Sequence, residues 1–213
     1  MKVLFFPTKI KFKLDEEKIK EFPEKGKIFL VYSIQYKEIA EKIKSLLKNE
    51  ITGFSQVLGC SKIKIPKETK AIILVSSGRF HAVSLAYETS KDVYLFEHNN
   101  FIKINEKEIE QIRNKKKASY SNFLNSEKIG ILISTKPGQE KLSQALKIKE
   151  IINQKFPEKK VYLFLSNNID FKEFENFDIQ SWVNSACPRL DFDDSNNKMI
   201  NISELFDLLN QNS

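Results

Sequence analysis

The chain has 213 residues, of which 41% are hydrophobic and 30% charged, and its 35 Lys and Arg against 28 Asp and Glu give a net charge of +7. This balance is typical of a soluble globular protein and excludes an intrinsically disordered chain. The longest apolar runs, residues 71–75 and 129–133, are too short to span a membrane, and the apolar start before Pro7 is too short for a signal peptide. We therefore expect a cytoplasmic protein with no membrane partner.

The basic excess is spread along the chain, and its one dense run is RNKKK at residues 113–117. Nucleic-acid surfaces combine basic residues with exposed aromatic side chains. Here most of the 17 Phe lie inside apolar runs or at helical spacing, which is typical of a core. We expect a solvated helix face at 113–117 and no direct nucleic-acid binding.

The predicted elements alternate between strands and helices. In chain order we expect strands at 27–33, 71–77, 92–98, 129–135, 160–166 and 178–186, and helices at 36–49, 80–90, 105–124, 140–156, 170–177 and 202–210. Pro157 stops one of these helices, and Asn201 is placed to cap the last one. This alternation indicates parallel sheets covered by helices, an α/β fold.

Two segments of the chain resemble one another. IILVSSGRF (72–80) and ILISTKPGQ (131–139) each run from an apolar strand through two hydroxyl residues to a glycine turn. This similarity predicts two small parallel-sheet α/β domains with flanking helices, at 15–122 and 123–213. Residues 1–14 are expected to form a strand that pairs outside this chain, because no crossover helix connects them to a parallel neighbour.

Ligands of parallel α/β sheets bind at the carboxyl ends of the strands. Two such ends are glycine turns before predicted helices, where free N–H groups favour a carboxylate or a phosphate, although plain connecting turns have the same composition. No Walker loop, Ser-His-Asp order or HExxH helix accompanies them. The candidate ligand-binding residues in the two turns are Ser76, Gly78, Arg79, His81, Ser134, Thr135, Lys136, Gly138 and Gln139.

The chain has two cysteines, Cys60 and Cys187, and neither belongs to a CxxC pair. On counting alone, two buried structural thiols are the ordinary interpretation. However, Cys187 directly follows a predicted strand, and Cys60 lies in the loop region before another, so both can reach the ligand edge. Thiolates there would suit a soft metal or an iron–sulfur cluster, although two are too few for a cubane without further ligands.

Four motifs then identify a family. SQVLGCS (55–61), SSGRFHAVSLA (76–86), STKPGQ (134–139) and WVNSACPRLDFDD (182–194) follow one another in this order. Together they resemble the diphthamide-synthesis family, the 3-amino-3-carboxypropyl transferases of archaea and eukaryotes. The resemblance extends from about residue 3 to residue 201.

The resemblance implies three similar α/β domains around a cleft, each giving one cysteine to a [4Fe-4S] cluster. S-adenosylmethionine would bind the iron that lacks a cysteine, and an electron from the cluster would break the bond between sulfur and the methionine γ-carbon. The 3-amino-3-carboxypropyl radical would then add to an imidazole carbon of a histidine in translation elongation factor 2. On this resemblance Cys60 and Cys187 are cluster ligands, and the two glycine turns hold S-adenosylmethionine, with Arg79 and Gln139 as preferred contacts.

The chain differs from the family because no part of it corresponds to the first domain and its cysteine. We favour a split enzyme in which a separate polypeptide supplies that domain, because both other cysteines and both glycine turns are kept. The strand at 1–14 would complete the missing domain, and the assembled enzyme could form a dimer. The alternatives are a non-catalytic partner subunit of the same complex and a simple nucleotide- or anion-binding α/β protein.

Overall fold

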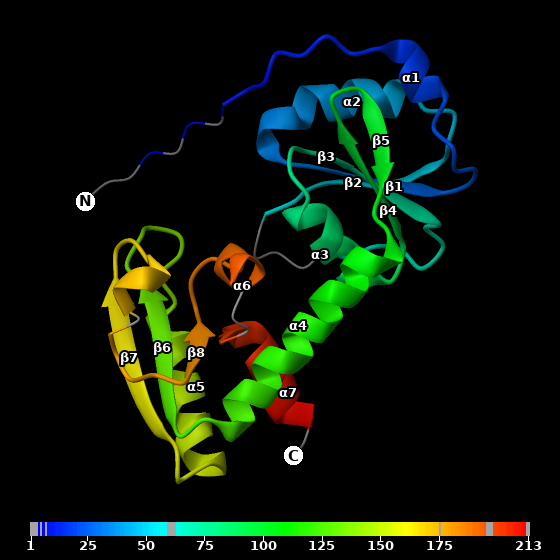
Figure 1. The fold of residues 1–213 in the computed structure, drawn as a ribbon. Coiled ribbons are helices and arrows are strands. Elements are labelled where there is room, and N and C mark those ends of the chain that lie inside the picture. The colour runs from blue at the N-terminus through cyan, green and yellow to red at the C-terminus, as the bar shows by residue number, and fades with distance from the viewer. Residues whose placement is uncertain are drawn as a thin grey trace. The chain divides into compact units, whose positions relative to one another are not determined.

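The computed structural model describes residues 4, 6, 8–58, 63–174, 176–194 and 198–211 (Figure 1). The chain divides into two compact units, Met1–Gln111 and Ile112–Ser213, and each contains one sheet. Both sheets are mostly parallel and carry flanking helices, so the predicted α/β fold class is confirmed.

The first unit is built on a five-stranded sheet of order β2-β1-β3-β4-β5, parallel except for β5, which is antiparallel to β4. Its strands are β1 Ile28–Tyr32, β2 Ile51–Gln56, β3 Ala71–Val75, β4 Asp92–Glu97 and β5 Asn100–Lys103, and its helices are α1 Glu16–Lys20, η1 Ile34–Tyr36, α2 Lys37–Leu46 and α3 Phe80–Thr89. Helices α2 and α3 lie on opposite faces of the sheet (Figure 1). Every residue of β1 and β3 is buried, as central strands of a parallel sheet covered on both faces should be.

The hairpin between β4 and β5 holds the segment that leads into α1. His98 and Asn99 take left-handed conformations with φ of 49° and 60°, as a tight hairpin turn requires. The Asn99 side chain donates to the carbonyl of Lys13 at 3.1 Å and accepts from the amide of Asp15 at 2.9 Å. These two bonds anchor the chain just before α1.

Residues 8–15 form no helix or strand, although the amide of Ile10 donates to the carbonyl of Gln35 at 3.1 Å. The predicted strand at 1–14 falls partly on Met1, Lys2, Val3, Phe5 and Pro7, which lie outside the described residues. Its pairing with a sheet outside this chain stays a prediction.

The second unit is built on a parallel sheet of order β7-β6-β8-β9. Its strands are β6 Lys128–Ser134, β7 Lys160–Ser166, β8 Ser181–Asn184 and β9 Met199–Asn201, and its helices are α5 Leu142–Lys155, η2 Phe171–Phe174, α6 Arg189–Asp193 and α7 Ile202–Gln211. The long helix α4, Glu106–Asn125, contains the boundary between the two units. Asn201 caps α7, as predicted, by accepting from the amide of Ser203 at 3.0 Å.

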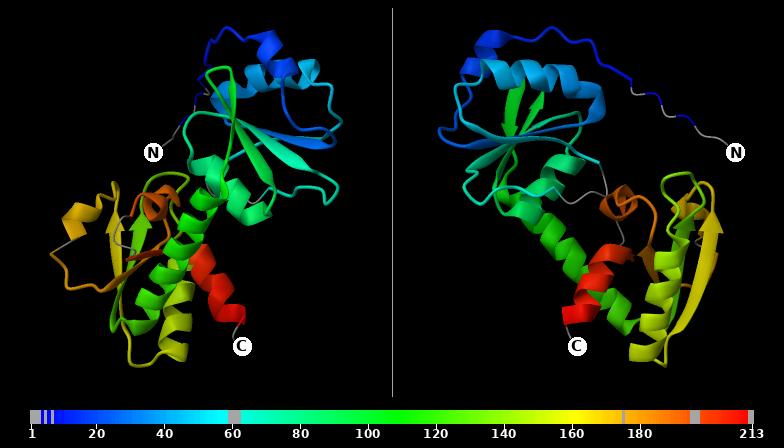
Figure 2. Two further views of the ribbon diagram at one scale, coloured as in Figure 1. Left: turned by 45° about the vertical axis from the view of Figure 1, so that its right-hand side comes forward. Right: turned by 180° about the vertical axis from the view of Figure 1, so that it is seen from behind.

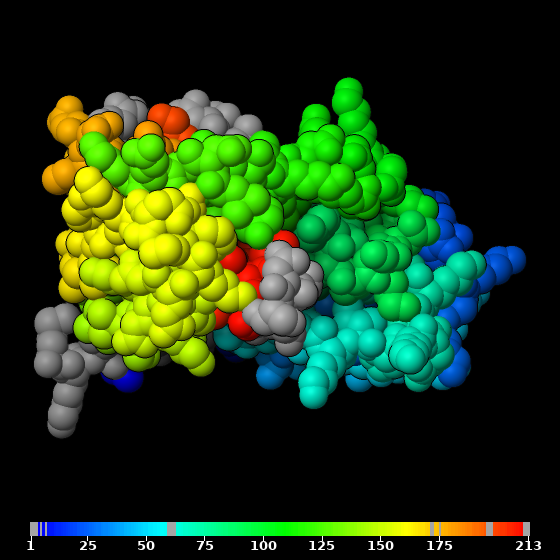
Figure 3. Space-filling model, turned by 90° about the horizontal axis from the view of Figure 1, so that it is seen from below, coloured from blue at the N-terminus to red at the C-terminus, as the bar shows by residue number. Residues whose placement is uncertain are grey.

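Two apolar layers cover the second sheet. On one face, α5 and α7 pack side chains such as Ile148 and Leu205 against β6 and β8. The two helices lie side by side in Figure 2, and red atoms of the C-terminal segment adjoin yellow-green and yellow atoms of the second unit in Figure 3. On the other face, the ring of Trp182 packs with Leu132, Phe174 and Met199. The strands are thereby fixed, and their carboxyl ends form one edge where a ligand can bind.

Candidate functional site

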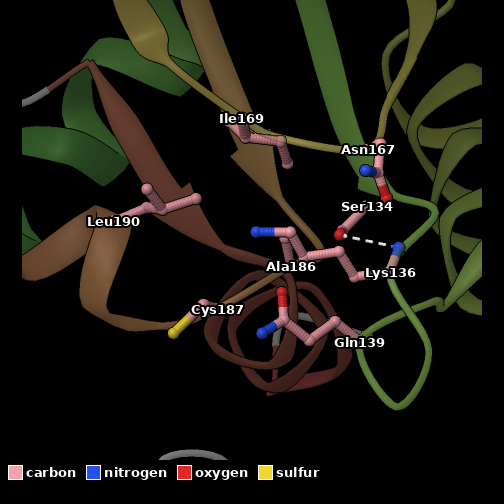
Figure 4. Close-up of a pocket in the computed structure, with 8 residues that line it drawn as sticks. All are labelled: Ser134, Lys136, Gln139, Asn167, Ile169, Ala186, Cys187 and Leu190. Carbon is pink, nitrogen blue, oxygen red and sulfur yellow. Dashed lines mark hydrogen bonds between the residues drawn. The ribbon is translucent and has the colours of Figure 1, made fainter. Parts of the chain in front are cut away.

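A pocket of about 160 Å³ lies at the carboxyl edge of the second sheet (Figure 4). Three strand ends line it, because β6, β7 and β8 run parallel and finish at the same edge. The lining residues are Ser134 at the end of β6, Lys136 and Gln139 after β6, Asn167 and Ile169 after β7, and Ala186, Cys187 and Leu190 after β8. The structure therefore brings one predicted glycine turn and one predicted cysteine into a single pocket.

The turn after β6 is held by Ser134. Its buried hydroxyl accepts from the amide of Lys136 at 3.2 Å, and the amide of Gln139 donates to the carbonyl of Lys136 at 3.0 Å. Gly138 has a φ of +80°, a conformation that favours glycine. Helix α5 begins only at Leu142, so the pocket residues belong to the turn and not to the first turn of the helix.

Two other predicted residues of this turn do not line the pocket. The amide of Thr135 donates to the carbonyl of Ser166 at 3.0 Å, which ties the turn to the end of β7. Gly138 contributes its backbone conformation. We therefore regard Lys136 and Gln139 as the side chains of the turn that can contact a ligand.

The loop after β8 carries Cys187, a free thiol that is partly exposed. Ser185 anchors the start of this loop, because its amide and its hydroxyl both donate to the carbonyl of Leu132, at 3.0 and 2.6 Å. Pro188 then precedes the short helix α6. Cys187 thus follows a fully buried strand and lines the pocket, and in the view of Figure 4 its sulfur points away from Lys136 and Gln139.

Asp191, in α6, has a strongly perturbed carboxyl group. Burial raises its pKa to about 7, and the hydrogen bonds from the amides of Asn201 and Asn184 oppose that rise. These bonds measure 2.8 Å from Asn201 and 2.6 Å from Asn184. Two amide groups thus hold the Asp191 carboxyl group in place, four residues after Cys187.

The other predicted turn belongs to the first unit, and its polar groups are already bound within the chain. The hydroxyl of Ser76 donates to the hydroxyl of Ser33 at 3.0 Å, and His81 packs against the ring of Phe80 in the first turn of α3. The amide of Gly78, where φ is +78°, donates to a carboxylate oxygen of Glu97 at 3.0 Å.

Arg79 makes a two-pronged contact with Glu108, from Nε and Nη2, with both distances 2.6 Å. This pairing raises the pKa of the guanidinium and lowers that of the carboxylate. The carboxylates that bind this turn in the structure therefore come from the protein itself. Contact between Arg79 and a ligand stays a prediction, and Glu108 would compete with that ligand.

Cys60 lies in residues 59–62, outside the described residues. Within the part of the chain that is described, no three His, Cys, Asp or Glu residues gather as a metal site. No helix in that same part is long and apolar enough to cross a membrane.

Sequence reasoning did not select two apolar residues of the pocket, Ile169 and Leu190. Leu190 lies within the motif at 182–194, but its apolar side chain gave no reason to place it at a ligand site. Ile169 lies outside the four motifs, three residues beyond the end of β7.

Comparison with known proteins decides the family. The family model described as "Putative diphthamide synthesis protein" matches residues 1–213. The chain belongs to this family. The resemblance drawn from the four motifs is thereby confirmed.

Two archaeal relatives are named 2-(3-amino-3-carboxypropyl)histidine synthase. The protein from Methanocaldococcus jannaschii is 31% identical over 209 residues, covering 91% of this chain and 57% of that protein. The one from Pyrococcus horikoshii is 27% identical over 194 residues, covering 84% and 55%. The chain thus spans just over half the length of these two relatives.

The fold of this diphthamide-synthesis family member matches solved structures of Dph2 from Pyrococcus horikoshii. One has a TM-score of 0.71 at 26% identity and covers 86% of this chain and 57% of that one. Another, determined with a 4Fe-4S cluster, has a TM-score of 0.68 at 27% identity and covers 87% and 57%.

Proposed function

We propose that this chain is part of an enzyme that transfers the 3-amino-3-carboxypropyl group of S-adenosylmethionine to a histidine of translation elongation factor 2. In this proposal Cys60 and Cys187 are two of the three cysteine ligands of a [4Fe-4S] cluster. The observation that carries it is the pocket of the second unit, which a free cysteine, Cys187, lines together with Lys136 and Gln139. A related solved structure holds a 4Fe-4S cluster, which supports the same assignment.

The chemistry of the pocket suits iron bound through sulfur. Cysteine thiolates are the standard ligands of iron–sulfur clusters, and Cys187 is free and partly exposed. The described residues that line the pocket include no carboxylate, so harder cations have little to bind there. When bound, the cluster would supply the electron that cleaves S-adenosylmethionine.

The residues beside the thiol can hold the group to be transferred. The 3-amino-3-carboxypropyl group carries a carboxylate and an amine. The ammonium of Lys136 can pair with the carboxylate, and the Gln139 amide can bond to either group. We expect these two side chains to orient the S-adenosylmethionine tail beside Cys187.

The third cysteine would come from protein outside these 213 residues. The relatives contain additional length that this chain does not match. We propose that a separate polypeptide supplies the corresponding domain, that the two chains assemble into one active enzyme, and that the assembly forms a dimer.

Anaerobic reconstitution with iron and sulfide tests the ligand assignment. The chain would be reconstituted alone and together with the region of the Methanocaldococcus jannaschii relative that it does not match. We expect a brown protein with bound iron and labile sulfide in the mixture, and a clear loss of both in Cys60→Ser and in Cys187→Ser. Equal iron content in the parent and in both variants would show that the cysteines are not ligands.

Transfer of label from S-adenosylmethionine labelled in its carboxyl group to elongation factor 2 then tests the activity. With dithionite added to reduce the cluster, we expect the reconstituted mixture to label the factor and each cysteine variant to fail. A mixture that keeps full activity with both cysteines replaced would instead identify this chain as a non-catalytic partner. Stabilisation by S-adenosylmethionine without any iron uptake would identify a simple nucleotide-binding protein.

A further inference from the structure

Three polar side chains meet behind the Cys187 loop. Asn184 ends β8 and is completely buried, and Asn201 ends β9 and is almost so. The two are paired in register on these neighbouring parallel strands. Their amides converge on Asp191, Asn184 donating to Oδ1 at 2.6 Å and Asn201 donating to Oδ2 at 2.8 Å. One carboxyl group thus connects two strand ends to helix α6.

The amide of Asn184 also binds the backbone on both sides of the thiol. Its Oδ1 accepts from the amide of Ala186 at 2.8 Å, and its Nδ2 donates to the carbonyl of Cys187 at 2.9 Å. The two hydrogens on Nδ2 are therefore shared between Cys187 and Asp191. A reversed amide would bring Oδ1 against two acceptors, so the orientation of this side chain is fixed by its surroundings.

Helix α6 is held from a second direction. The ammonium of Lys115, in α4, donates to the carbonyl of Phe192 at 2.7 Å. The amide of Leu190 donates to the carbonyl of Cys187 at 3.0 Å, so that carbonyl receives two donors. The backbone of Cys187 is fixed both by the buried amide and by the helix that follows it.

Such a buried polar network contributes little net stability. Buried polar groups lose their hydration, and replacing them with well-packed apolar residues is often neutral or stabilising. What hydrogen bonds add is a defined geometry, because each donor must face its acceptor. Here that geometry is imposed on the residue that carries the thiol.

We propose that Asn184, Asp191 and Asn201 are positioning residues that fix the backbone of Cys187 and thereby the direction of its thiol at the pocket. This inference rests on the proposed function, since it gives the thiol the role of an iron ligand. It adds three residues to that site, none of which needs to contact the iron or S-adenosylmethionine.

Exchanging the side chains of Asn184 and Asp191 distinguishes a role in positioning Cys187 from a role in stability alone. Asn184→Asp places a carboxylate against Asp191 and against the Cys187 carbonyl, and Asp191→Asn leaves its amide facing another amide. In the double variant, the new amide at 191 can donate to the new carboxylate at 184 and accept from Asn201. That pair is restored, whereas the Cys187 carbonyl still lacks its side-chain donor. Asn168→Asp, at an exposed residue near the same pocket, is the matched control.

Amide hydrogen exchange, measured by NMR on the iron-free chain, reports how firmly the Cys187 loop is held. We expect the Leu190 amide to exchange about tenfold faster in Asn184→Asp, the factor given by the loss of one buried hydrogen bond. The double variant should recover thermal stability but keep the fast exchange. Asn168→Asp and the Ser185 amide, which donates to β6, should match the parent.

Thiol alkylation supplies a second readout, with Cys60→Ser as the background so that Cys187 is the sole thiol. A neutral maleimide is used, and the limiting rate at high pH is compared so that differences in thiolate fraction do not contribute. We expect this rate to differ from the parent in Asn184→Asp and in the double variant alike. If Asn184→Asp does not fold, the uncharged Asn184→Ser takes its place.

Two results would overturn the inference. In the first, the variants at residue 184 show the same Leu190 exchange rate and the same Cys187 alkylation rate as the parent. In the second, both rates return to the parent values in the double variant, which would mean that the network only stabilises the fold. Neither result depends on iron. Failure of the reconstituted mixture, which contains the parent chain and the separate domain, to load iron would instead count against the proposed function alone.

Discussion

Gly130, in the centre of β6, is expected to be intolerant of any side chain. A Cβ placed there would lie 2.4 Å from Cζ3 and 2.5 Å from Cε3 of Trp182, its register partner on β8. The indole cannot swing away, because it is 2% exposed and its ring centre lies 4.9 Å from that of Phe164 and 5.6 Å from that of Phe174. Overpacking of this kind costs about 1–3 kcal/mol. We therefore expect Gly130→Ala to destabilise the second unit by that amount.

Urea unfolding followed by tryptophan fluorescence measures this directly, because Trp182 is the sole tryptophan. With a slope of about 1–3 kcal/mol per molar urea, the midpoint should fall by roughly 1 M. Gly53→Ala is the matched control, since it creates a similar clash with Phe29 in the first unit. It should leave the native emission of Trp182 unchanged.

The clash also predicts a specific rescue. Phenylalanine lacks the two indole atoms that the new methyl group would meet, so Trp182→Phe should remove most of the cost of Gly130→Ala. Followed by circular dichroism, the double-mutant cycle should give a favourable coupling of at least about 1 kcal/mol. Additive effects, or a Gly130→Ala variant as stable as the parent, would refute this account of the sheet.

Three further outcomes follow from single groups. Burial raises the pKa of Asp191 to about 7, so the stability that the protonated carboxyl group contributes is fully present below about pH 4 and is lost as the pH rises through 7. The free energy of unfolding should therefore fall by up to about 4 kcal/mol over this range. Urea titrations at several pH values should show that Asp191→Asn removes this fall. Arg79→Lys should lower the free energy of unfolding by about 0.5–1 kcal/mol, seen as a small fall in the thermal midpoint, because an ammonium cannot make both bonds to Glu108; an unchanged midpoint would mean that solvent already screens the pair. Gly138→Ala should cost about 1 kcal/mol from its φ of +80° alone, since no atom lies within 4 Å of the added Cβ, and chemical denaturation that shows no loss would mean that the turn adopts another conformation.

The sequence predicts well the strands and helices whose apolar pattern is uninterrupted. Strands such as β3 (AIILV) are uninterrupted apolar runs and were predicted to within two residues. Strand β2 (ITGFSQ) was missed because it is half-buried at a sheet edge and carries Thr, Gly and Ser. Strand β9 has three residues, and only its pairing with β8 makes it a strand. The helix predicted at 170–177 was wrong in type, since a single 3-10 turn forms at Phe171–Phe174.

The residues of the site were likewise predicted where neighbouring sequence identifies them, and were missed where a distant part of the chain decides their contacts. The rule that ligands bind at carboxyl strand ends placed Ser134, Gln139 and Cys187 at one edge, and the pocket confirms that they meet. No local pattern shows that Glu108 binds Arg79 from 29 residues away. The domain limits at residues 122 and 123 stay a prediction; the compact units separate at Gln111, inside α4, where helical periodicity continues without a break.

The position of the thiol relative to the glycine turn follows from the sheet and not from the helices. Ser185 donates twice to the carbonyl of Leu132, which lies two residues before Ser134 on β6. The loop that carries Cys187 and the turn that carries Lys136 therefore start from adjacent, bonded points of neighbouring strands. A parallel sheet keeps such points in register, whereas helix α5 begins beyond the turn and could shift without changing them. Hydrogen bonds between β6 and β8 thus determine how far the proposed iron ligand lies from the residues expected to hold the S-adenosylmethionine tail.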